Sequence, residues 1–212
     1  MKLNYRDTAP LRLFPILMVL ENLSDEVYIV GGAVRDLMCE AVPNDYDLVT
    51  DTPIQELAQE FERNGFKVSL TGSNFLVLNV YSSGYAVEVA NFRKDVSCDG
   101  RHAVVEPGTI FDDATRRDFT CNSLYLNTKT SEVLDPLGQG IDDCNLNILR
   151  FSGNPKDRIK EDYLRVFRFM RFLNKGFNPD DKSMRAVRQL WNEAYNNTTP
   201  ERVRVEMEKM VL

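Results

Sequence analysis

The fold of this chain is decided by residues 27–50, VYIVGGAVRDLMCEAVPNDYDLVT. Residues 27–30 form a short apolar run that stops at two glycines, which is typical of a strand that runs into a turn. The pattern after the glycines predicts a helix over residues 33–40, and residues 45–50 predict a second strand. The stretch therefore indicates a strand–helix–strand unit whose polar residues lie at the turns.

The Gly31-Gly32 pair lies between the predicted strand and helix. Two glycines let the backbone turn tightly and can bring N–H groups to an anion at a helix N-terminus. Arg35, one turn into the helix, can reach the same anion. The pattern is neither a Walker loop nor a GxGxxG fingerprint, and a plain tight turn is the alternative.

Asp45 and Asp47 are the first candidate catalytic residues. At positions i and i+2 of a strand, both carboxylates point to one face of the sheet, where they repel each other unless a cation lies between them. Paired carboxylates with open positions hold Mg²⁺ beside substrate phosphates. Glu88, on a candidate neighbouring strand, could supply a third carboxylate. The alternative is a solvated strand face with Asp45 in a turn.

Two further segments carry arginines beside acids. In RRDFTCNSL, residues 116–124, the arginines and Asp118 suit a triphosphate and a ribose, or else cap a helix that this segment opens. In KEDYLRVFRFMRF, residues 160–172, Asp162 and Arg165 lie three apart on a predicted helix, away from its apolar stripe. They could meet the Watson–Crick edge of a base, or form an ordinary surface ion pair.

The rest of the chain is predicted as a mixed α/β part to about residue 150, followed by an all-helical part. Ser82-Ser83-Gly84 indicates the turn of a hairpin. The polar residues 95–107 indicate a mobile loop. The remaining predicted elements are helices over residues 11–23, 53–64, 159–174 and 180–195, a helix beginning near residues 199–201, strands over 75–81, 85–92 and 124–127, and a turn at 135–138.

Composition excludes several classes of protein. The 212 residues contain no apolar run of about 18, so we expect no membrane span. The four scattered cysteines and single histidine argue against a zinc site and for reduced thiols in the cytoplasm. The net charge is −6, but residues 150–212 hold 14 Lys and Arg against 9 Asp and Glu. This asymmetry suggests an acidic part that holds cations and a basic part that holds anions.

In this order and spacing, the motifs resemble the class II tRNA nucleotidyltransferase (CCA-adding enzyme) and bacterial poly(A) polymerase family. The matching segments run from about residue 27 to the end: GGAVRD with DYD, VEVANFRKD, DGRHAVVEP, RRDFTCNSL, DPLGQGIDD, EDYLRVFR and PERVRVEMEKM. The resemblance implies an α+β fold with two parts. Residues 1–150 would be a nucleotidyltransferase head with a mixed β-sheet and flanking helices, and residues 151–212 a helical neck with a shortened, RNA- and base-binding body.

The resemblance also implies the chemistry: template-independent addition of CCA to a tRNA 3′ end from CTP and ATP. Asp45 and Asp47 would bind two Mg²⁺ ions, with Glu88 as a further catalytic residue. Asp162 and Arg165 would act as a protein template for the base. The other implied nucleotide contacts are Gly31, Gly32, Arg35, Arg117, Arg168 and Arg171 for phosphates, and Asp118 and Asn122 for the ribose.

Three departures from the family pattern stand out. Met38-Cys39-Glu40 replaces an apolar residue and a glycine before the aspartates, and Cys121 and Ser123 replace an apolar residue and an alanine. The longer helical body that grips tRNA in the family is absent from this chain. The alternatives are a poly(A) polymerase, an enzyme that adds only CC or A, a non-catalytic nucleotide- or RNA-binding module, and a metal-binding structural domain. The sequence indicates no oligomeric state.

Overall fold

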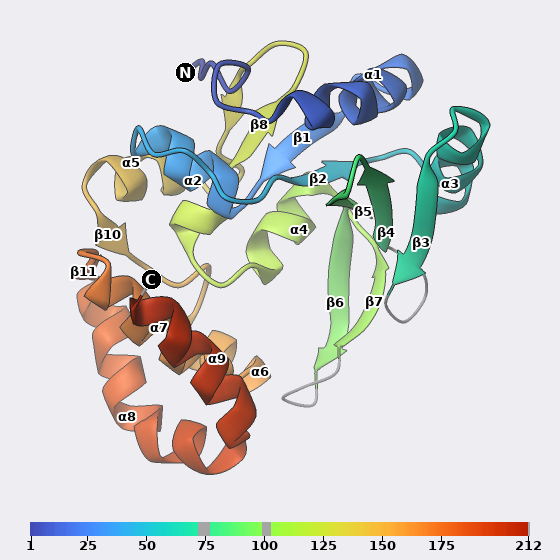
Figure 1. Ribbon diagram of the computed structural model, residues 1–212. Coiled ribbons are helices and arrows are strands. Elements are labelled where there is room, and N and C mark those ends of the chain that lie inside the picture. The colour runs from blue at the N-terminus through green and yellow to red at the C-terminus, as the bar shows by residue number, and fades with distance from the viewer. Residues whose placement is uncertain (72–76, 99–102, 212) are drawn as a thin grey trace.

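The computed structural model describes residues 1–71, 77–98 and 103–211 (Figure 1). Its main sheet has the strand order β3-β4-β5-β2-β1-β8-β9. The strands of this sheet are β1 (Val27–Val30), β2 (Asp47–Thr50), β3 (Lys67–Thr71), β4 (Val77–Ser82), β5 (Tyr85–Asn91), β8 (Tyr125–Asn127) and β9 (Val133–Leu134).

The sheet is mixed, as predicted. β1 runs antiparallel to both β2 and β8, whereas β2 and β5 are parallel. The register pairs Val30 with Asp47. The end of β1, where the Gly-Gly turn begins, therefore lies beside the start of β2, where the aspartates lie.

Helices cover both faces of the sheet. α1 (Phe14–Leu23), which follows a 3-10 turn at Leu11–Leu13, α2 (Gly32–Met38) and α3 (Ile54–Arg63) contribute buried residues to the main core. A smaller cluster on the other face contains Val30, Val49 and Ala114 of α4 (Ile110–Arg116). Asp47 is two residues before Val49 in the strand, so it points to this second face.

The C-terminal part packs directly onto the head. The head ends with α5 (Gly140–Asn145) and β10 (Ile148–Leu149). The C-terminal part contains α6 (Pro155–Glu161), α7 (Leu164–Asn174), β11 (Asn178–Pro179), α8 (Asp181–Asn197) and α9 (Pro200–Val211). Phe119 of the head lies 5.3 Å, ring centre to ring centre, from Phe172 of α7, and Phe151 stacks on Phe169 at 5.5 Å. One continuous core thus joins both parts, and the domain boundary at residue 150 stays a prediction.

Most predicted elements are present, within a few residues of their predicted ends. The hairpin is confirmed between β4 and β5, where Ser82 pairs with Tyr85. Ser83 and Gly84 both have positive φ, which is the requirement of the tightest hairpin turns. Of the strand predicted over residues 75–81, Phe75 and Leu76 lie outside the described residues.

Four predictions about elements are wrong. The polar stretch 95–107 is not a loop but pairs as β6 (Arg93–Cys98) with β7 (Ala103–Pro107), while residues 99–102 lie outside the described residues. The segment 116–124 does not open a helix, because α4 ends at Arg116 and only a 3-10 turn follows. The helix predicted over 159–174 is two helices, broken at Asp162, whose backbone is extended. The C-terminal part is not all-helical, because β11 pairs with β10.

α2 ends in a turn that normally needs glycine. Glu40 has a φ of 57°, and the hydrogen bonds Glu40 N–H to Leu37 O and Ala41 N–H to Asp36 O form a Schellman motif. Glu40 therefore occupies the C′ position, where glycine is the most common residue. The left-handed conformation costs a residue with a Cβ about 1 kcal/mol more than glycine.

Glu40→Gly should therefore raise the free energy of unfolding by about 1 kcal/mol, since Glu40 is exposed and loses only its strain. Urea denaturation at neutral pH would measure the gain. Glu40→Ala is the matched control, because it removes the carboxylate but keeps the Cβ. An equal gain in both variants would show that charge, not backbone strain, is responsible.

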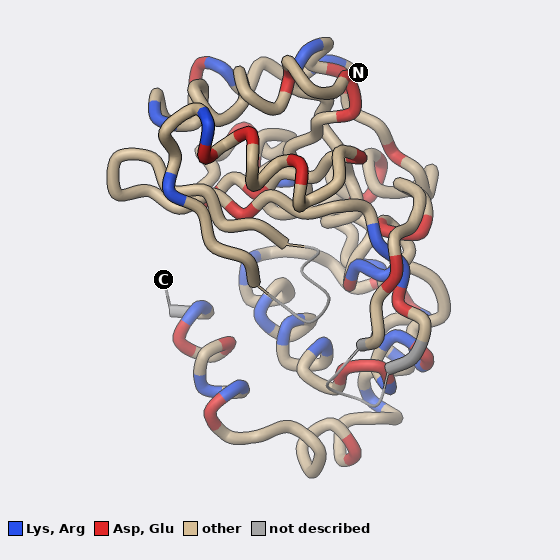
Figure 2. Tube along the Cα trace, turned by 90° about the vertical axis from the view of Figure 1, so that its right-hand side faces the viewer, with Lys and Arg blue, Asp and Glu red and all other residues tan. Residues whose placement is uncertain are grey.

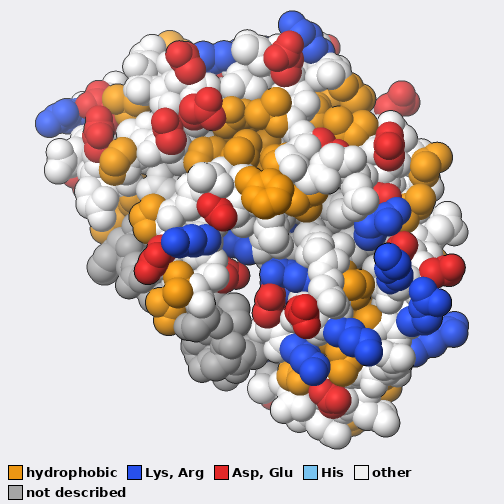
Figure 3. Space-filling model, turned by 180° about the vertical axis from the view of Figure 1, so that it is seen from behind, with side chains coloured by type: hydrophobic (Ala, Val, Ile, Leu, Met, Phe, Trp, Pro, Cys, Tyr) orange, Lys and Arg blue, Asp and Glu red, His pale blue; other side chains and the backbone are white. Residues whose placement is uncertain are grey.

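Charge is divided between the two parts. Figure 2 shows Lys and Arg following one another along the C-terminal helices, whereas acidic residues are frequent in the head. The space-filling view from behind shows the same concentration of basic side chains over the helical part (Figure 3). In the part of the chain that the structure describes, we find no helix of the length and apolarity that a bilayer crossing requires.

Candidate active site

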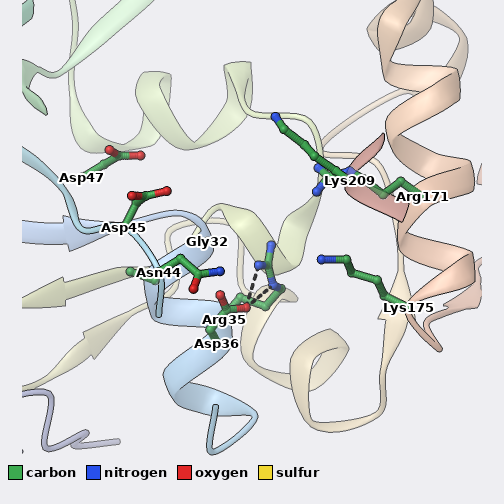
Figure 4. Close-up of a pocket in the computed structure, with 10 residues that line it drawn as sticks. Gly32, Arg35, Asp36, Asn44, Asp45, Asp47, Arg171, Lys175 and Lys209 are labelled. Atoms are coloured by element: carbon green, nitrogen blue, oxygen red, sulfur yellow. Dashed lines mark hydrogen bonds and ion pairs between the residues drawn. The ribbon is translucent and has the colours of Figure 1, made fainter. Parts of the chain in front are cut away.

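A hollow of about 350 Å³ lies between the head and the C-terminal helices (Figure 4). Its two walls have opposite charge. Acidic side chains come from the head, and basic ones from α7, α9 and the end of α2. The lining residues are Gly32, Ala33, Arg35, Asp36, Asn44, Asp45, Asp47, Arg171, Lys175 and Lys209.

Asp45 and Asp47 lie side by side at one edge of the hollow, with their carboxylates turned the same way (Figure 4). Only Asp47 belongs to β2; Asp45 precedes the strand, which corrects the predicted boundary. Tyr46 between them is buried, and its hydroxyl lies 3.2 Å from the Thr8 hydroxyl. Because this side chain is anchored inward, its two neighbours are both directed away from the main core and line the hollow.

The electrostatics of the pair fit a bound cation. Burial, the nearby charge of Glu88 and that of Asp45 raise the pKa of Asp47 to about 6, although Arg117 opposes the shift. A divalent ion between the carboxylates would remove this repulsion, and carboxylate oxygens are the ligands that Mg²⁺ prefers. Among residues 1–71, 77–98 and 103–211, no group of three His, Cys, Asp or Glu comes close enough to form a cation site. Glu88 lies on β5, next to the Leu48–Val89 pair, and its catalytic role stays a prediction.

This shift predicts a pH-dependent effect of Mg²⁺. A carboxyl whose pKa is raised on folding destabilises the ion-free protein once the pH rises through about 6. Mg²⁺ should therefore raise the melting temperature more at pH 7.5 than at pH 5, where a proton occupies Asp47. Thermal melts with and without Mg²⁺ at both pH values would measure this, with Asp47→Asn as control. The same Mg²⁺ effect at both pH values, or in the variant, would contradict the assignment.

The Gly-Gly turn brings the backbone against an arginine. Gly31 has a φ of 69°, which favours glycine, and a Cβ there would lie 3.1 Å from an Arg117 guanidinium nitrogen. Arg117 is held in place by Asp113, 2.9 Å away, and by the Tyr125 hydroxyl at 3.1 Å. The turn, the N-terminus of α2 and this guanidinium thus form one corner with the kind of donors that an anion requires.

A chain of polar contacts connects this corner to α7. Arg35 donates to the Asn122 amide oxygen at 2.6 Å, and Asn122 donates to Asp118 at 3.0 Å. The second Asp118 oxygen forms an ion pair with Arg168 at 2.8 Å. Burial alone would raise the pKa of Asp118, but the charge of Arg168 and the hydrogen bonds from Asn122 and the Phe119 N–H outweigh it and lower the pKa. Four residues predicted as nucleotide contacts are therefore in one network.

The predicted base-reading pair is not assembled. Asp162 accepts from Arg202 of α9 at 3.1 Å, whereas Arg165 lies 2.8 Å from Glu161 and donates to two backbone carbonyls. Arg171 pairs with Glu206 at 2.8 Å. Both Asp162 and Arg165 are described residues, and their side chains turn to different partners. Their role as a template stays a prediction.

Sequence reasoning identified Arg171 but missed the two lysines beside it in the basic wall that faces the aspartates. Lys175 and Lys209 reach into the hollow from the end of α7 and from α9 (Figure 4). Helical spacing could have found both. Lys175 lies seven residues after Arg168 and so on the same face, and Lys209 lies seven after Arg202. Asn44 and Asp36, which also line the hollow, carry no such signal.

Together, the fold and the site define a protein of the nucleotidyltransferase type, with paired carboxylates beside a glycine turn and basic residues opposite. The family model of the Poly A polymerase head domain matches residues 27–150, more than half of the chain. This chain belongs to that family.

Individual relatives agree with this assignment. The human protein "CCA tRNA nucleotidyltransferase 1, mitochondrial" is 32% identical over 97% of this chain and 48% of its own length. Poly(A) polymerase I of Salmonella typhi is 34% identical over 78% of this chain and 38% of its own. The Bacillus stearothermophilus CCA-adding enzyme in complex with CTP superposes with a TM-score of 0.78 and 28% identity, covering 94% of this chain and 47% of that one. The chain thus spans half or less of these relatives.

Proposed function

We propose that this protein is a template-independent RNA nucleotidyltransferase that adds CCA to the 3′ end of tRNA from CTP and ATP. The observation that carries the proposal is the Asp45–Asp47 pair, which faces the basic wall of Arg171, Lys175 and Lys209 across one hollow. A triphosphate needs cations around its oxygens, and the attacking hydroxyl needs a carboxylate-bound metal ion beside it. Family membership supports the same chemistry.

Each part of the site has a proposed task. Bound Mg²⁺ would activate the RNA 3′-hydroxyl and neutralise charge on the triphosphate, with Asp45 and Asp47 holding two ions and Glu88 assisting. Gly31, Gly32 and Arg35 would bind the phosphates. Three more arginines, Arg117, Arg168 and Arg171, would complete the anion site. Asp118 and Asn122 would face the ribose.

Base selection would require a rearrangement. For Arg165 to donate to a base, it must leave Glu161, and Asp162 must turn from Arg202. We propose that CTP or ATP takes these positions, so that Asp162 accepts from the exocyclic amino group and Arg165 donates to ring nitrogen and carbonyl. The ion pairs with Glu161 and Arg202 would then keep Arg165 and Asp162 in their present positions until CTP or ATP binds.

Poly(A) addition is the second candidate. The Salmonella poly(A) polymerase is 34% identical and the human CCA enzyme 32%, so similarity does not separate them. An enzyme that adds only CC or only A, or a binding module without catalysis, would share the same residues. We expect the protein to act in the cytoplasm, although the name of the human relative places that protein in mitochondria.

An extension assay separates these candidates. The protein and Mg²⁺ would be incubated with a tRNA lacking its CCA end, with CTP and ATP offered singly and together, and products would be resolved to one nucleotide. Addition of two C and one A supports the proposal. A long A-only tail would assign the protein to poly(A) addition, and one or two nucleotides to a partial enzyme. Nucleotide binding without extension would indicate a binding module.

A further inference from the structure

A second hollow, of about 580 Å³, lies between the start of α6 and the first half of α8. It shares no lining residue with the hollow that contains Asp45 and Asp47. Lys156 contributes to it from α6, and Lys182 and Arg185 from α8. Gly153, Asn154, Pro155, Ala186 and Gln189 complete the lining. We call this hollow the basic groove.

The cations of the basic groove are exposed, and none of them has an ionic partner among the residues that the structure describes. Within the described part of the chain, Lys156, Lys182 and Arg185 form no ion pair, and neither does Lys160, one turn after Lys156. The arginines of α7 differ in this respect, since Arg165, Arg168 and Arg171 are all paired. Like charges that remain unpaired around one hollow repel each other and focus a positive potential in it.

The acidic residues nearby do not cancel this charge. Asp157 and Asp181 lie next to the cations in the sequences of α6 and α8, but in the described part of the chain neither forms an ion pair with them. Glu161 is occupied by Arg158 and Arg165. The Asn154 side chain accepts from the Lys156 N–H and so caps α6.

The arrangement of the cations suits a chain of phosphates. Lys182 and Arg185 are one helical turn apart, about 4.5 Å along the axis of α8, and Lys156 faces them from the other wall. A phosphate backbone offers charges at about 3.4 Å of axial rise per strand, so successive phosphates can meet successive cations. Arg, Lys and side-chain amides such as that of Gln189 are the usual backbone contacts of nucleic-acid-binding proteins.

We propose that the basic groove binds the sugar–phosphate backbone of the RNA substrate at a segment away from the 3′ end being extended. The inference rests on the proposed function for the identity of the RNA, because the groove itself selects only a polyanion. Contacts of this kind would position the RNA and add affinity without reading its sequence. They would also partly explain how a protein with a net charge of −6 retains RNA.

The test is salt-dependent RNA binding, measured by fluorescence anisotropy of a labelled tRNA lacking CCA, without nucleotide. In Lys182→Ala/Arg185→Ala, affinity near 0.1 M salt should fall about tenfold or more, and the slope of log affinity against log salt should shrink by about 2. Lys156→Ala/Lys160→Ala should act in the same direction. Alanine keeps the helix at these exposed positions. Arg63→Ala/Lys67→Ala removes the same charge from α3 and β3 across the molecule and should leave both values unchanged (Figure 1).

Equal affinity and slope in the groove variants and the unaltered protein would overturn the proposal. So would an equal loss in the control, since net charge alone would then explain it. Poly-glutamate is a second probe, and groove-dependent binding of it as tight as that of tRNA would assign the groove to an acidic protein instead. Extension is measured separately on a short single-stranded RNA, where the groove variants should retain activity. If no RNA is extended by the unaltered protein, the proposed function fails while the binding result still decides the groove.

Discussion

Asp45→Asn and Asp47→Asn proteins should each add nucleotides on the order of 10³-fold more slowly than the unaltered protein. Each substitution keeps the side-chain shape but removes the charge that would hold Mg²⁺ beside the triphosphate. Metal stabilisation of the reacting oxygens amounts to several kcal/mol of the barrier, and each 1.36 kcal/mol is a factor of ten in rate. Single-turnover extension of a labelled RNA at saturating CTP and ATP would measure the loss.

The matched control is Asp51→Asn. Asp51 follows the other end of β2, where it accepts a hydrogen bond from Ser24, and it does not line the hollow. Its rate should stay within a factor of two or three of the unaltered protein, a change worth well under 1 kcal/mol. If Asp45→Asn or Asp47→Asn also extends RNA at the unaltered rate, the pair does not hold the catalytic metal ions. Equal losses in all three variants would instead indicate a general effect on the fold.

Much of the head was predictable because its signals are local. The run at residues 27–30, the glycines after it and the Ser83-Gly84 turn each restrict the backbone within a few residues. The strands β6 and β7 were missed because β6 begins with three consecutive charged residues, Arg93, Lys94 and Asp95, and because the two strands pair with each other outside the main sheet. The break at Asp162 was missed for a different reason. The apolar stripe continues through it, while the Asp162 carboxylate accepts from Leu164 N–H and starts a new helix.

The sequence predicted which residues belong to the site, but it did not predict which residues they contact. Motif order indicated Asp118, Arg168 and Arg171, yet their partners come from elsewhere in the chain: Arg168 meets Asp118 fifty positions away, and Arg171 meets Glu206. Such pairs depend on how α7 packs against the head and α9. No local pattern contains that information. The same packing determines the partner of Asp162, which is Arg202 of α9. Arg165, which spacing alone had placed with Asp162, pairs instead with Glu161 four residues before it.

Asp113 carries the largest expected effect on stability. Its side chain is fully buried, and its two oxygens accept from Arg116, Arg117 and the Tyr125 hydroxyl, the last at 2.6 Å. Burial alone would raise the pKa of Asp113, but the two guanidinium groups and the hydroxyl outweigh it, so the pKa lies below its ordinary value. The carboxylate is therefore the counter-charge that keeps Arg117 beside the Gly31 turn.

Asp113→Asn should lower the free energy of unfolding by about 3–5 kcal/mol, because it leaves a buried guanidinium without its charge partner. Urea denaturation at neutral pH would measure the loss. A carboxyl whose pKa is lowered on folding stabilises the protein at pH values above the pKa that it has in the unfolded chain. This stabilisation is lost as the pH falls through the pKa that it has in the folded protein. The difference between variant and unaltered protein should therefore shrink below about pH 4.

The neighbouring Asp112 provides the control, because it is only partly buried and belongs to the capping box with Thr109. Asp112→Asn can still accept from the Thr109 N–H and should cost less than about 1 kcal/mol. Equal, small losses in the free energy of unfolding of both variants would mean that water or other groups satisfy Arg116 and Arg117 once the charge of Asp113 is removed. A large loss confined to Asp113→Asn, with weaker CTP and ATP binding in the folded fraction, would show that one buried carboxylate both stabilises the head and positions the phosphate-binding arginine.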